Sequence, residues 1–401
     1  MKRLVTKHEP IIIYNRQPLP NTVIKSIFLA GPTPRKDLSM SWRKEFVDCL
    51  IANGYDGLII VPEEHGQPFN PDNKKEQIDW EYTCMCAADC IVFWIPRQFR
   101  SDFEMIALTT NVEFGRFLNS HKLVIGGPKE AVKNEYLQHI SQNQYKWHFS
   151  MEECAKTAIK FVGEGIRRTR TECKIPAHIF ASSQFQNWYQ PMKTVGNSLT
   201  DFQMEYEFFM PKAKQLFLAI WKPSIYINES SEGFRENRIK SNEFVIARTD
   251  MSYICAFCKN TENIMDSEIV VCEEFRSPVV NQHEMIFELP GGSSVKDNEE
   301  RLQVASNELK EETGLTIPAN RFQYLSLKQS AGTLCSHRIA LFSVELSHDE
   351  INRIRYDKQV HGVIEDTECI HLHVMKAKDA FQHMDWTNIG LVNYALQQHK
   401  I

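Results

Sequence analysis

The chain has 401 residues, which is long enough for two or three domains that each bury a hydrophobic core. Its 42% apolar and 24% charged residues are typical of soluble globular proteins. The net charge of −5 excludes the strongly basic surface of a nucleic-acid binder, so we expect small anionic ligands and no nucleic-acid partner.

No stretch of the sequence has the length of a signal peptide core or of a membrane span. The apolar run near the start covers three residues, 11–13, and later runs are also too short. We therefore expect a cytoplasmic protein without a membrane partner, whose 11 cysteines are reduced thiols. Cys255 and Cys258 form a CxxC pair without a fourth zinc ligand at a suitable spacing, and the alternation of SYICAFC favours strand positions in a core.

Strands and helices alternate through residues 1–171. The strands are short and rich in Ile and Val, and the helices repeat their apolar residues at helical spacing. This pattern predicts a parallel sheet covered on both faces, a Rossmann-like α/β domain. The predicted strands are 25–31, 57–62, 89–96 and 122–128, and the predicted helices are 39–53, 77–88, 110–119 and 151–170.

The segment 172–235 is rich in aromatic residues and has no clear period. It is too apolar for a flexible linker. We interpret it as a connecting subdomain that takes part in an interface, and we expect the protein to be a homodimer. The stretch 227–237 is the best candidate for an exposed loop.

Residues 236–401 form a third segment with a strand-rich pattern, which predicts a separate α+β domain. The predicted strands are 243–248, 252–257, 268–275, 285–290, 321–327 and 338–346, and the predicted helices are 299–313 and 388–398.

Three glutamates, Glu308, Glu311 and Glu312, lie within about one turn of the helix predicted at 299–313. At this spacing the carboxylates can crowd one face, where like charges repel one another. A divalent cation would reverse that penalty, and Mg²⁺ or Mn²⁺ would bind with a few carboxylates, water and phosphate oxygens. The alternative is a solvated acidic face, which is the usual fate of a charge run.

The stretch ELPGGSSVKDNEERLQVASNELKEETGLTI (288–317) resembles the Nudix box, in which glycines and glutamates recur at fixed spacing. It departs from the family pattern at two places. Asn307 stands at the arginine position, and Gly292 is one residue further from Glu299 than in the pattern. The resemblance implies a Nudix fold that hydrolyses a nucleoside diphosphate linkage with a bound metal.

The flanking sequences EEFRSPVV (273–280), FELPGG (287–292) and WTNIGLVNYAL (386–396) look like the ADP-ribose pyrophosphatase branch of that family. This resemblance implies a set of metal ligands and catalytic residues in the same domain. They are Glu308 and Glu312 as the main ligands, helped by Glu311 and the carbonyl of Gly291.

The same resemblance implies substrate contacts from Phe275 and Arg276, because a guanidinium suits phosphate oxygens. A late glutamate in a loop would act as the catalytic base. Glu365 fits that role, and Glu368 competes with it. The alternative for both is a surface acid with no chemical role.

A second candidate site lies at the carboxyl edge of the predicted parallel sheet, where ligands of open α/β sheets bind. The loop 28–35 follows the first predicted strand, and there the backbone at Gly31 and the Arg35 side chain could meet a phosphate. Glu113 lies near the start of the helix predicted at 110–119, beyond the third strand.

Four motifs in this domain, LAGPTPR (29–35), Trp80-Glu81, AADCIVFW (87–94) and VEFGR (112–116), resemble the nucleoside 2-deoxyribosyltransferase family. That family includes relatives that hydrolyse the N-glycosidic bond of nucleoside monophosphates. The glutamate of its last motif attacks the anomeric carbon and forms a covalent glycosyl-enzyme. The resemblance implies Glu113 as nucleophile, Glu81 as second acid, Asp79 behind it, and Asp89 as a structural or ligand-contacting residue.

The alternative for Glu113 is a helix cap or salt bridge in a domain that only binds nucleotide. The two resemblances together predict a bifunctional nucleotide-processing enzyme. One site would split ADP-ribose or an NAD-like dinucleotide into monophosphates, and the other would cleave or transfer the base of a nucleotide. A nucleotide-sensing regulator with little or no turnover is the rival interpretation, and Asn307 keeps it open.

Overall fold

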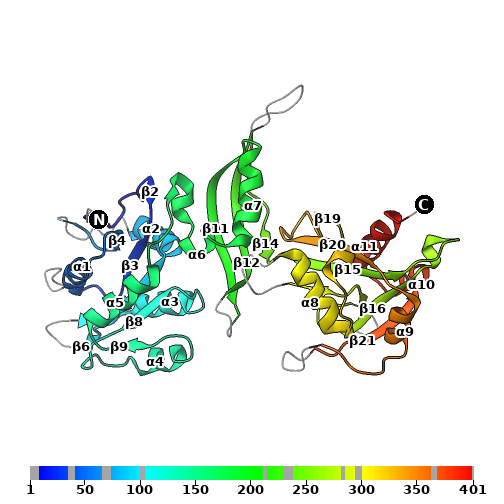
Figure 1. Ribbon diagram of the computed structural model, residues 1–401. Helices are drawn as coiled ribbons and strands as arrows, with labels where there is room; N and C mark the ends of the chain where they lie inside the picture. Colours follow the sequence, from blue (N-terminus) through cyan, green and yellow to red (C-terminus); the bar gives the residue numbers. More distant parts are fainter. Residues whose placement is uncertain are drawn as a thin grey trace, which may run out of the picture. The chain divides into compact units, whose positions relative to one another are not determined.

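The computed structural model describes residues 9–34, 41–65, 74–99, 104–210, 215–228, 238–280, 285–293, 300–362 and 368–399. The chain divides into two compact units, Met1–Phe209 with Ala219–Val245 and Met210–Leu218 with Ile246–Ile401. The colours of Figure 1 follow the chain from blue in the first unit to red in the second. Most of the aromatic segment 172–235 belongs to the first unit.

A six-stranded sheet forms the centre of the first unit, and all its neighbouring strands are parallel. Five helices accompany it within the described part of residues 9–162. This confirms the predicted parallel α/β architecture. In sheet order the strands are β1 (Ile11–Tyr14), β4 (Leu58–Val61), β3 (Ser26–Ala30), β5 (Cys90–Trp94), β8 (Leu123–Gly126) and β9 (Trp147–His148). The helices are α1 (Trp42–Ala52), α2 (Lys74–Ala87), α3 (Leu108–Phe117), α4 (Glu135–Ser141) and α5 (Met151–Val162).

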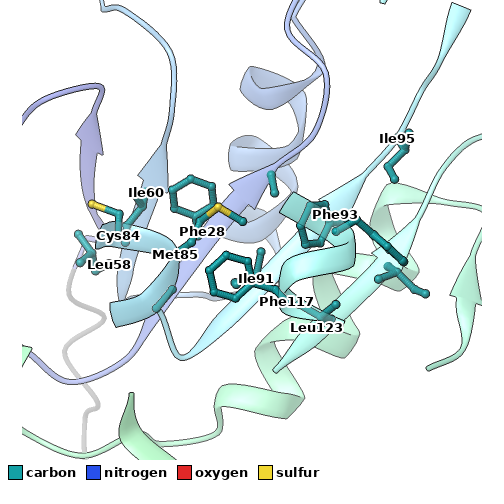
Figure 2. Close-up of a cluster of buried hydrophobic side chains, with 14 of the residues drawn as sticks. Phe28, Leu58, Ile60, Cys84, Met85, Ile91, Phe93, Ile95, Phe117 and Leu123 are labelled. Atoms are coloured by element: carbon teal, nitrogen blue, oxygen red, sulfur yellow. The ribbon is translucent and has the colours of Figure 1, made fainter. Parts of the chain in front are cut away.

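Each central strand buries both of its faces, because successive side chains point to opposite sides. In β3, Phe28 packs with α2 and α3, whereas Ile27 and Leu29 pack with α1 and α5. Figure 2 shows the first of these cores, where Phe28 and Phe93 of the sheet lie near Met85 and Phe117 of the helices. The Ile- and Val-rich strands of the sequence are therefore those of a sheet covered on both faces.

The end of α5 differs from the prediction. The sequence predicted a helix over 151–170, but the helix ends at Val162. Gly163 and Gly165 have φ values of 56° and 69°, a left-handed conformation that ends a helix. The chain then enters β10 (Arg168–Thr169), which pairs with β2 (Thr22–Val23).

The aromatic segment is regular structure rather than the aperiodic connection that the sequence indicated. Rings of Phe185, Trp188, Tyr189, Phe202 and Trp221 pack on one another with centroids 5.1–6.2 Å apart. The elements here are η3 (Arg170–Lys174), α6 (Ala177–Phe180), α7 (Ser183–Thr194), β11 (Ser198–Phe209), β12 (Leu216–Ile227) and β13 (Arg238–Lys240).

A small hairpin earlier in the chain is formed by β6 (Gln98–Phe99) and β7 (Glu104–Met105).

A mixed seven-stranded sheet forms the second unit, in which β15 and β20 are parallel and the other neighbours are antiparallel. Its strands are β15 (Met251–Cys258), β16 (Glu268–Phe275), β17 (Met285–Glu288), β18 (Gly291–Gly292), β19 (Gln323–Gln329), β20 (Arg338–Glu345) and β21 (His371–Lys376). The strand β14 (Val245–Arg248) pairs with β12 and lies outside this sheet. The helices are η4 (Ile264–Asp266), α8 (Arg301–Thr313), η5 (Ala319–Arg321), α9 (His348–Arg355), α10 (Ala377–Ala380) and α11 (Trp386–Gln397).

The two faces of this sheet are covered by different helices. One core contains residues of α8 and α9, and the other contains residues of α10 and α11. Cys255 and Cys258 are both buried but belong to opposite cores, so the CxxC pair is part of the strand β15. The mixed sheet with helices agrees with the predicted α+β pattern, while the assignment to the Nudix fold stays a prediction.

Across the described ranges, no helix combines the length and apolar character that crossing a membrane requires.

Candidate active sites

A cavity of about 310 Å³ opens at the carboxyl end of β3, at the sheet edge where the sequence predicted a ligand site. Its walls come from the turn after β3, from α1 and α2, and from the first turns of α3. The polar and small residues of this lining include Gly31, Thr33, Arg43, Gln77, Glu81, Thr109, Thr110 and Glu113. With Pro62, which follows the strand Leu58–Val61, five segments of the chain therefore meet at one site.

Gly31 is the point where the backbone turns into the cavity. Its φ is 152°, and a Cβ at this position would collide with the Trp94 carbonyl oxygen and with the Trp42 ring. A glycine is required here because the chain passes too close to β5 and α1 for a side chain. The turn itself is held by the Trp42 indole N–H, which donates to the Pro32 carbonyl at 3.0 Å.

Glu113 and Glu81 face this cavity from α3 and α2, and both side chains are half-buried. Burial is the main reason that the pKa of Glu113 is raised to about 7; the Glu81 carboxylate adds to this rise and Arg43 opposes it. Burial also raises the pKa of Glu81. A hydrogen bond that Gln77 Nε2 donates to Glu81 Oε1 at 2.8 Å acts in the opposite direction and lowers that pKa. The site thus holds two interacting carboxyl groups whose protonation is linked.

Arg43 is a residue of this cavity that the sequence analysis missed. Its side chain is 2% exposed, and its Nη1 donates to Glu63 Oε1 at 2.6 Å and to Thr33 Oγ1 at 3.0 Å. Its Nη2 and Nε donate to the carbonyls of Gly31 and Leu29 at 2.5 and 3.0 Å. The guanidinium therefore fixes the turn after β3 and supplies a positive charge beside two acids.

A signal for Arg43 was present in the sequence. It stands on the side of the helix that carries Phe46, Val47 and Leu50, all of which are buried. A charged residue on the apolar side of a helix is rarely buried unless it has partners, so it marks a built polar site.

The other predicted residues of this domain lie elsewhere. Asp79 is exposed on α2 and does not line the cavity. Asp89 is buried before β5, where Arg168 Nη2 pairs with its Oδ2 at 2.6 Å and the backbone N–H of Ser26 and of Ala177 donate to it. Of the two roles that the sequence left open for Asp89, these contacts favour the structural one, since its carboxylate is used by structural partners. Arg35 lies outside the described residues.

Glu308 and Glu312 of α8 meet the Gly291-Gly292 strand of the second unit. The Gly291 N–H donates to Glu312 Oε2 at 3.0 Å, and a Cβ at Gly292 would come within 2.6–2.8 Å of the Glu308 carboxylate. A side chain at Gly292 would have to displace the Glu308 carboxylate, whereas a side chain at Gly291 would collide with the Ser252 carbonyl oxygen and with Tyr253. The Gly291 carbonyl as a metal ligand stays a prediction, since the hydrogen bond to Glu312 uses the N–H of that residue.

The Glu312 carboxyl is 8% exposed, and its pKa is held well above the usual range. Burial is the first cause, and the carboxylates of Glu308 and Glu288 add to it. Hydrogen bonds from Gly291 N–H and the Cys272 thiol act in the opposite direction. A cation beside Glu312 would remove this penalty.

Arg276 lies across two acids that the sequence analysis did not single out. Its Nη2 is 2.7 Å from Glu274 Oε2 and 2.8 Å from Glu288 Oε1. The arginine side chain remains 41% exposed, and Phe275 beside it is 52% exposed. The acids on the predicted strands 268–275 and 285–290 could have indicated this pair of partners.

Two further residues were predicted for this site. Glu311 is exposed on α8, and Glu365 lies outside the described residues. Within the described ranges, no three His, Cys, Asp or Glu side chains are grouped as a metal site.

Comparison with known families concerns the first of these two sites. Residues 24–131 match the family model described as nucleoside 2-deoxyribosyltransferase like. The first unit contains a nucleoside 2-deoxyribosyltransferase-like domain. The matched range includes Gly31, Arg43, Glu81 and Glu113, so the whole 310 Å³ cavity belongs to it. No curated protein matches the chain.

Proposed function

We propose that this protein is a bifunctional nucleotide-processing enzyme. The first unit would cleave or transfer the base of a nucleotide at its N-glycosidic bond. The second unit would hydrolyse a nucleoside diphosphate derivative such as ADP-ribose or an NAD-like molecule. The observation that carries the proposal is the pair Glu113 and Glu81, which face one cavity at the carboxyl edge of a deoxyribosyltransferase-like domain.

In the first unit, Glu113 would act as the nucleophile. Its carboxylate oxygen forms a bond to the anomeric carbon while the bond from that carbon to the base nitrogen breaks. The electron pair of the broken bond leaves with the base, which takes a proton from Glu81. Burial keeps the pKa of Glu81 raised, which favours the protonated form that this role requires.

The glycosyl ester on Glu113 is then attacked by water or by a second base. Water gives hydrolysis and a second base gives transfer. In either step the attacking group gives a proton back to the Glu81 carboxylate while the bond to Glu113 breaks, which releases the Glu113 carboxylate. Arg43 stabilises that carboxylate electrostatically. A 5′-phosphate would find backbone N–H groups at the turn after β3 and at the first turn of α3, where Thr109 and Thr110 line the cavity.

In the second unit, Glu308 and Glu312 would hold Mg²⁺ or Mn²⁺ together with phosphate oxygens of the substrate. The fit is supported by the buried Glu312 carboxyl, whose pKa is raised by burial and then by Glu308. Two carboxylates suffice, because Mg²⁺ completes its shell with water and phosphate. The bound ion would supply charge neutralisation and an activated water.

Arg276 would orient the diphosphate in this scheme. Its guanidinium is already fixed by Glu288 and Glu274, so it is preorganised for phosphate oxygens. Glu311 and Glu365 would be secondary groups of the same site. The two reactions are compatible in sequence, since a nucleoside monophosphate released in the second unit is a substrate type for the first.

A nucleotide sensor with little or no turnover is the second candidate, and one observation favours it. The family arginine that steadies the Nudix glutamates is replaced by Asn307, whose Oδ1 accepts a hydrogen bond from Gln303 Nε2 at 2.8 Å. The asparagine side chain therefore points to a neighbour on its own helix. A cytoplasmic homodimer remains part of the prediction.

A panel of nucleotides, incubated with the whole chain and Mg²⁺ and analysed by mass spectrometry, tests the proposal. We expect free base that disappears in Glu113→Gln, and phosphate-containing fragments that disappear in Glu312→Gln. Binding of ADP-ribose or a mononucleotide without either product would identify the protein as a sensor. Lys310→Gln, which changes an exposed charged residue of the same helix that has no role in the proposed site, is the matched control.

A further inference from the structure

A second cavity of about 280 Å³ lies beside α2 in the first unit. It is formed by the segment before β2, by Trp80 and Thr83 of α2, and by Arg170 and Lys174 of η3. No residue is shared between its lining and that of the 310 Å³ cavity, although both cavities use α2. It is therefore a separate site on another face of the helix.

Arg170 is held in an unusual backbone conformation at this cavity. Its φ is 52°, in the left-handed region that residues other than glycine rarely adopt, and its N–H donates to the Asn21 carbonyl at 2.9 Å. Such strain persists only where the surroundings enforce it, and it is concentrated at functional sites. The guanidinium of Arg170 is exposed and forms no hydrogen bond or ion pair within the described part of the chain. It is thus available to an anion.

Lys174 places a second cation in the same cavity. Its Nζ is 2.6 Å from Asp201 Oδ1, but the two side chains are 39% and 57% exposed. An ion pair this exposed contributes little and can be exchanged for an incoming anion. Asn21 and Thr171 add neutral polar groups to the lining.

Part of the cavity wall is apolar, and its largest side chain is fixed in orientation. Trp80 donates its indole N–H to the Gln17 carbonyl at 2.6 Å, which holds the ring in one orientation. Leu19 and Pro20 continue this wall. A ligand that fits has an anionic group at one end and an uncharged carbon body at the other.

We propose that this cavity binds a small phosphate monoester, with its phosphate at Arg170 and Lys174 and its carbon body against Trp80. Paired cations favour a phosphate dianion, and an arginine can bind two of its oxygens at once. A volume near the lower end of small-molecule pockets, roughly 300 Å³, selects a sugar phosphate rather than a dinucleotide.

Calorimetric titration of the whole chain with ribose 5-phosphate tests this site, with ribose and inorganic phosphate as comparison ligands. We expect ribose 5-phosphate to bind in an event that Arg170→Asn weakens roughly tenfold or more, the usual effect of losing a charged hydrogen bond. Asparagine tolerates the left-handed conformation, so this variant keeps the backbone. Arg167→Asn is the matched control, since Arg167 is exposed in the same segment and does not line the cavity.

A second pair of variants separates binding from folding. Lys174→Gln is expected to weaken binding, whereas Asp201→Asn leaves the lysine free of its competitor and is expected to bind as tightly or more tightly. Unchanged binding in both Arg170→Asn and Lys174→Gln would place the phosphate elsewhere and overturn the proposal. Equal affinity for ribose and ribose 5-phosphate would also contradict it.

Discussion

Glu113 lies where its ionised form is disfavoured, because burial and the Glu81 carboxylate together raise its pKa to about 7. A nucleophilic carboxylate must be deprotonated, so it is active above this pKa and protonated below it. We expect kcat/KM for base release to fall about tenfold per pH unit below about pH 7, and to fall again at higher pH, where Glu81 loses the proton that it gives to the base. A steady-state profile that instead rises as the pH falls would assign Glu113 the role of general acid.

Arg43 links the electrostatics of the site to the stability of the fold. In Arg43→Met the half-buried Glu63 loses its ion-pair partner and keeps the hydrogen bond from Ser41 Oγ, and we expect the unfolding free energy to fall by about 3–5 kcal/mol, measured by urea denaturation. The loss of the positive charge also raises the pKa of Glu113 further, so the acid limb of the activity profile moves to higher pH. Lys44→Met, an exposed neighbour, should change neither quantity.

The sequence predicted Glu113, Glu81 and Gly31, and the structure places all three at one cavity. The sequence was sufficient to predict these residues because short motifs carry them at the ends of recognisable strands and helices. It missed Arg43, whose role depends on carbonyl groups of a turn twelve and fourteen residues away. Its place on the apolar side of its helix indicated a buried charge, but tertiary packing decides which carbonyl groups that charge contacts.

At the scale of single elements, the turn after β3 gives a direct test of the packing argument. A methyl group at Gly31 would overlap the Trp94 carbonyl oxygen and the Trp42 ring. We expect Gly31→Ala to lower the unfolding free energy by about 1–3 kcal/mol, the cost of enforced backbone strain. Gly115→Ala in α3 has open space around its new methyl group and should be neutral or slightly stabilising. Equal effects of both changes would contradict the close contact at Gly31.

The helix α8 carries a buried acid whose pKa in the folded state is raised by burial and then by Glu308. The folded state therefore binds the Glu312 proton more tightly, and stability is lost as the pH rises above the unfolded value near 4.5. Without metal at pH 7 we expect Glu312→Gln to be more stable than the parent by about 1–2 kcal/mol, with no difference at pH 4.

Divalent metal should reverse that order. Mg²⁺ is expected to raise the melting temperature of the parent chain and to leave that of Glu312→Gln unchanged, because the variant lacks one ligand. Thermal denaturation with and without Mg²⁺ measures both effects. A parent chain that does not respond to Mg²⁺ would argue against the metal site on α8.

The bounds of a helix or strand could be predicted where a single pattern, such as an apolar run with clear ends, determined them. The strand 268–275 was predicted with the same bounds as β16, since its apolar run has clear ends. The helix over 151–170 was extended too far, because helical spacing outweighed Gly163 and Gly165 in the prediction. The strand β11 was not seen at all, since its buried residues Leu199 and Phe202 do not alternate regularly.

At the scale of the whole molecule, the two candidate sites lie in different compact units. Each unit has its own hydrophobic cores, so we expect the two activities to be lost separately. Glu113→Gln should abolish base release, by on the order of a thousandfold or more, and leave diphosphate hydrolysis intact. Glu312→Gln should have the opposite effect. Loss of both products in either single variant would contradict independent sites.

The pairing of Asp89 with Arg168 has a consequence for where the first unit can be cut. The family match ends at residue 131. A recombinant fragment that stops there would still contain every residue that lines the 310 Å³ cavity. It would lack Arg168 and the Ala177 N–H, and so would bury an uncompensated carboxylate at the base of its central strand. We expect such a fragment to be insoluble on expression, and one that extends beyond Ala177 to satisfy Asp89.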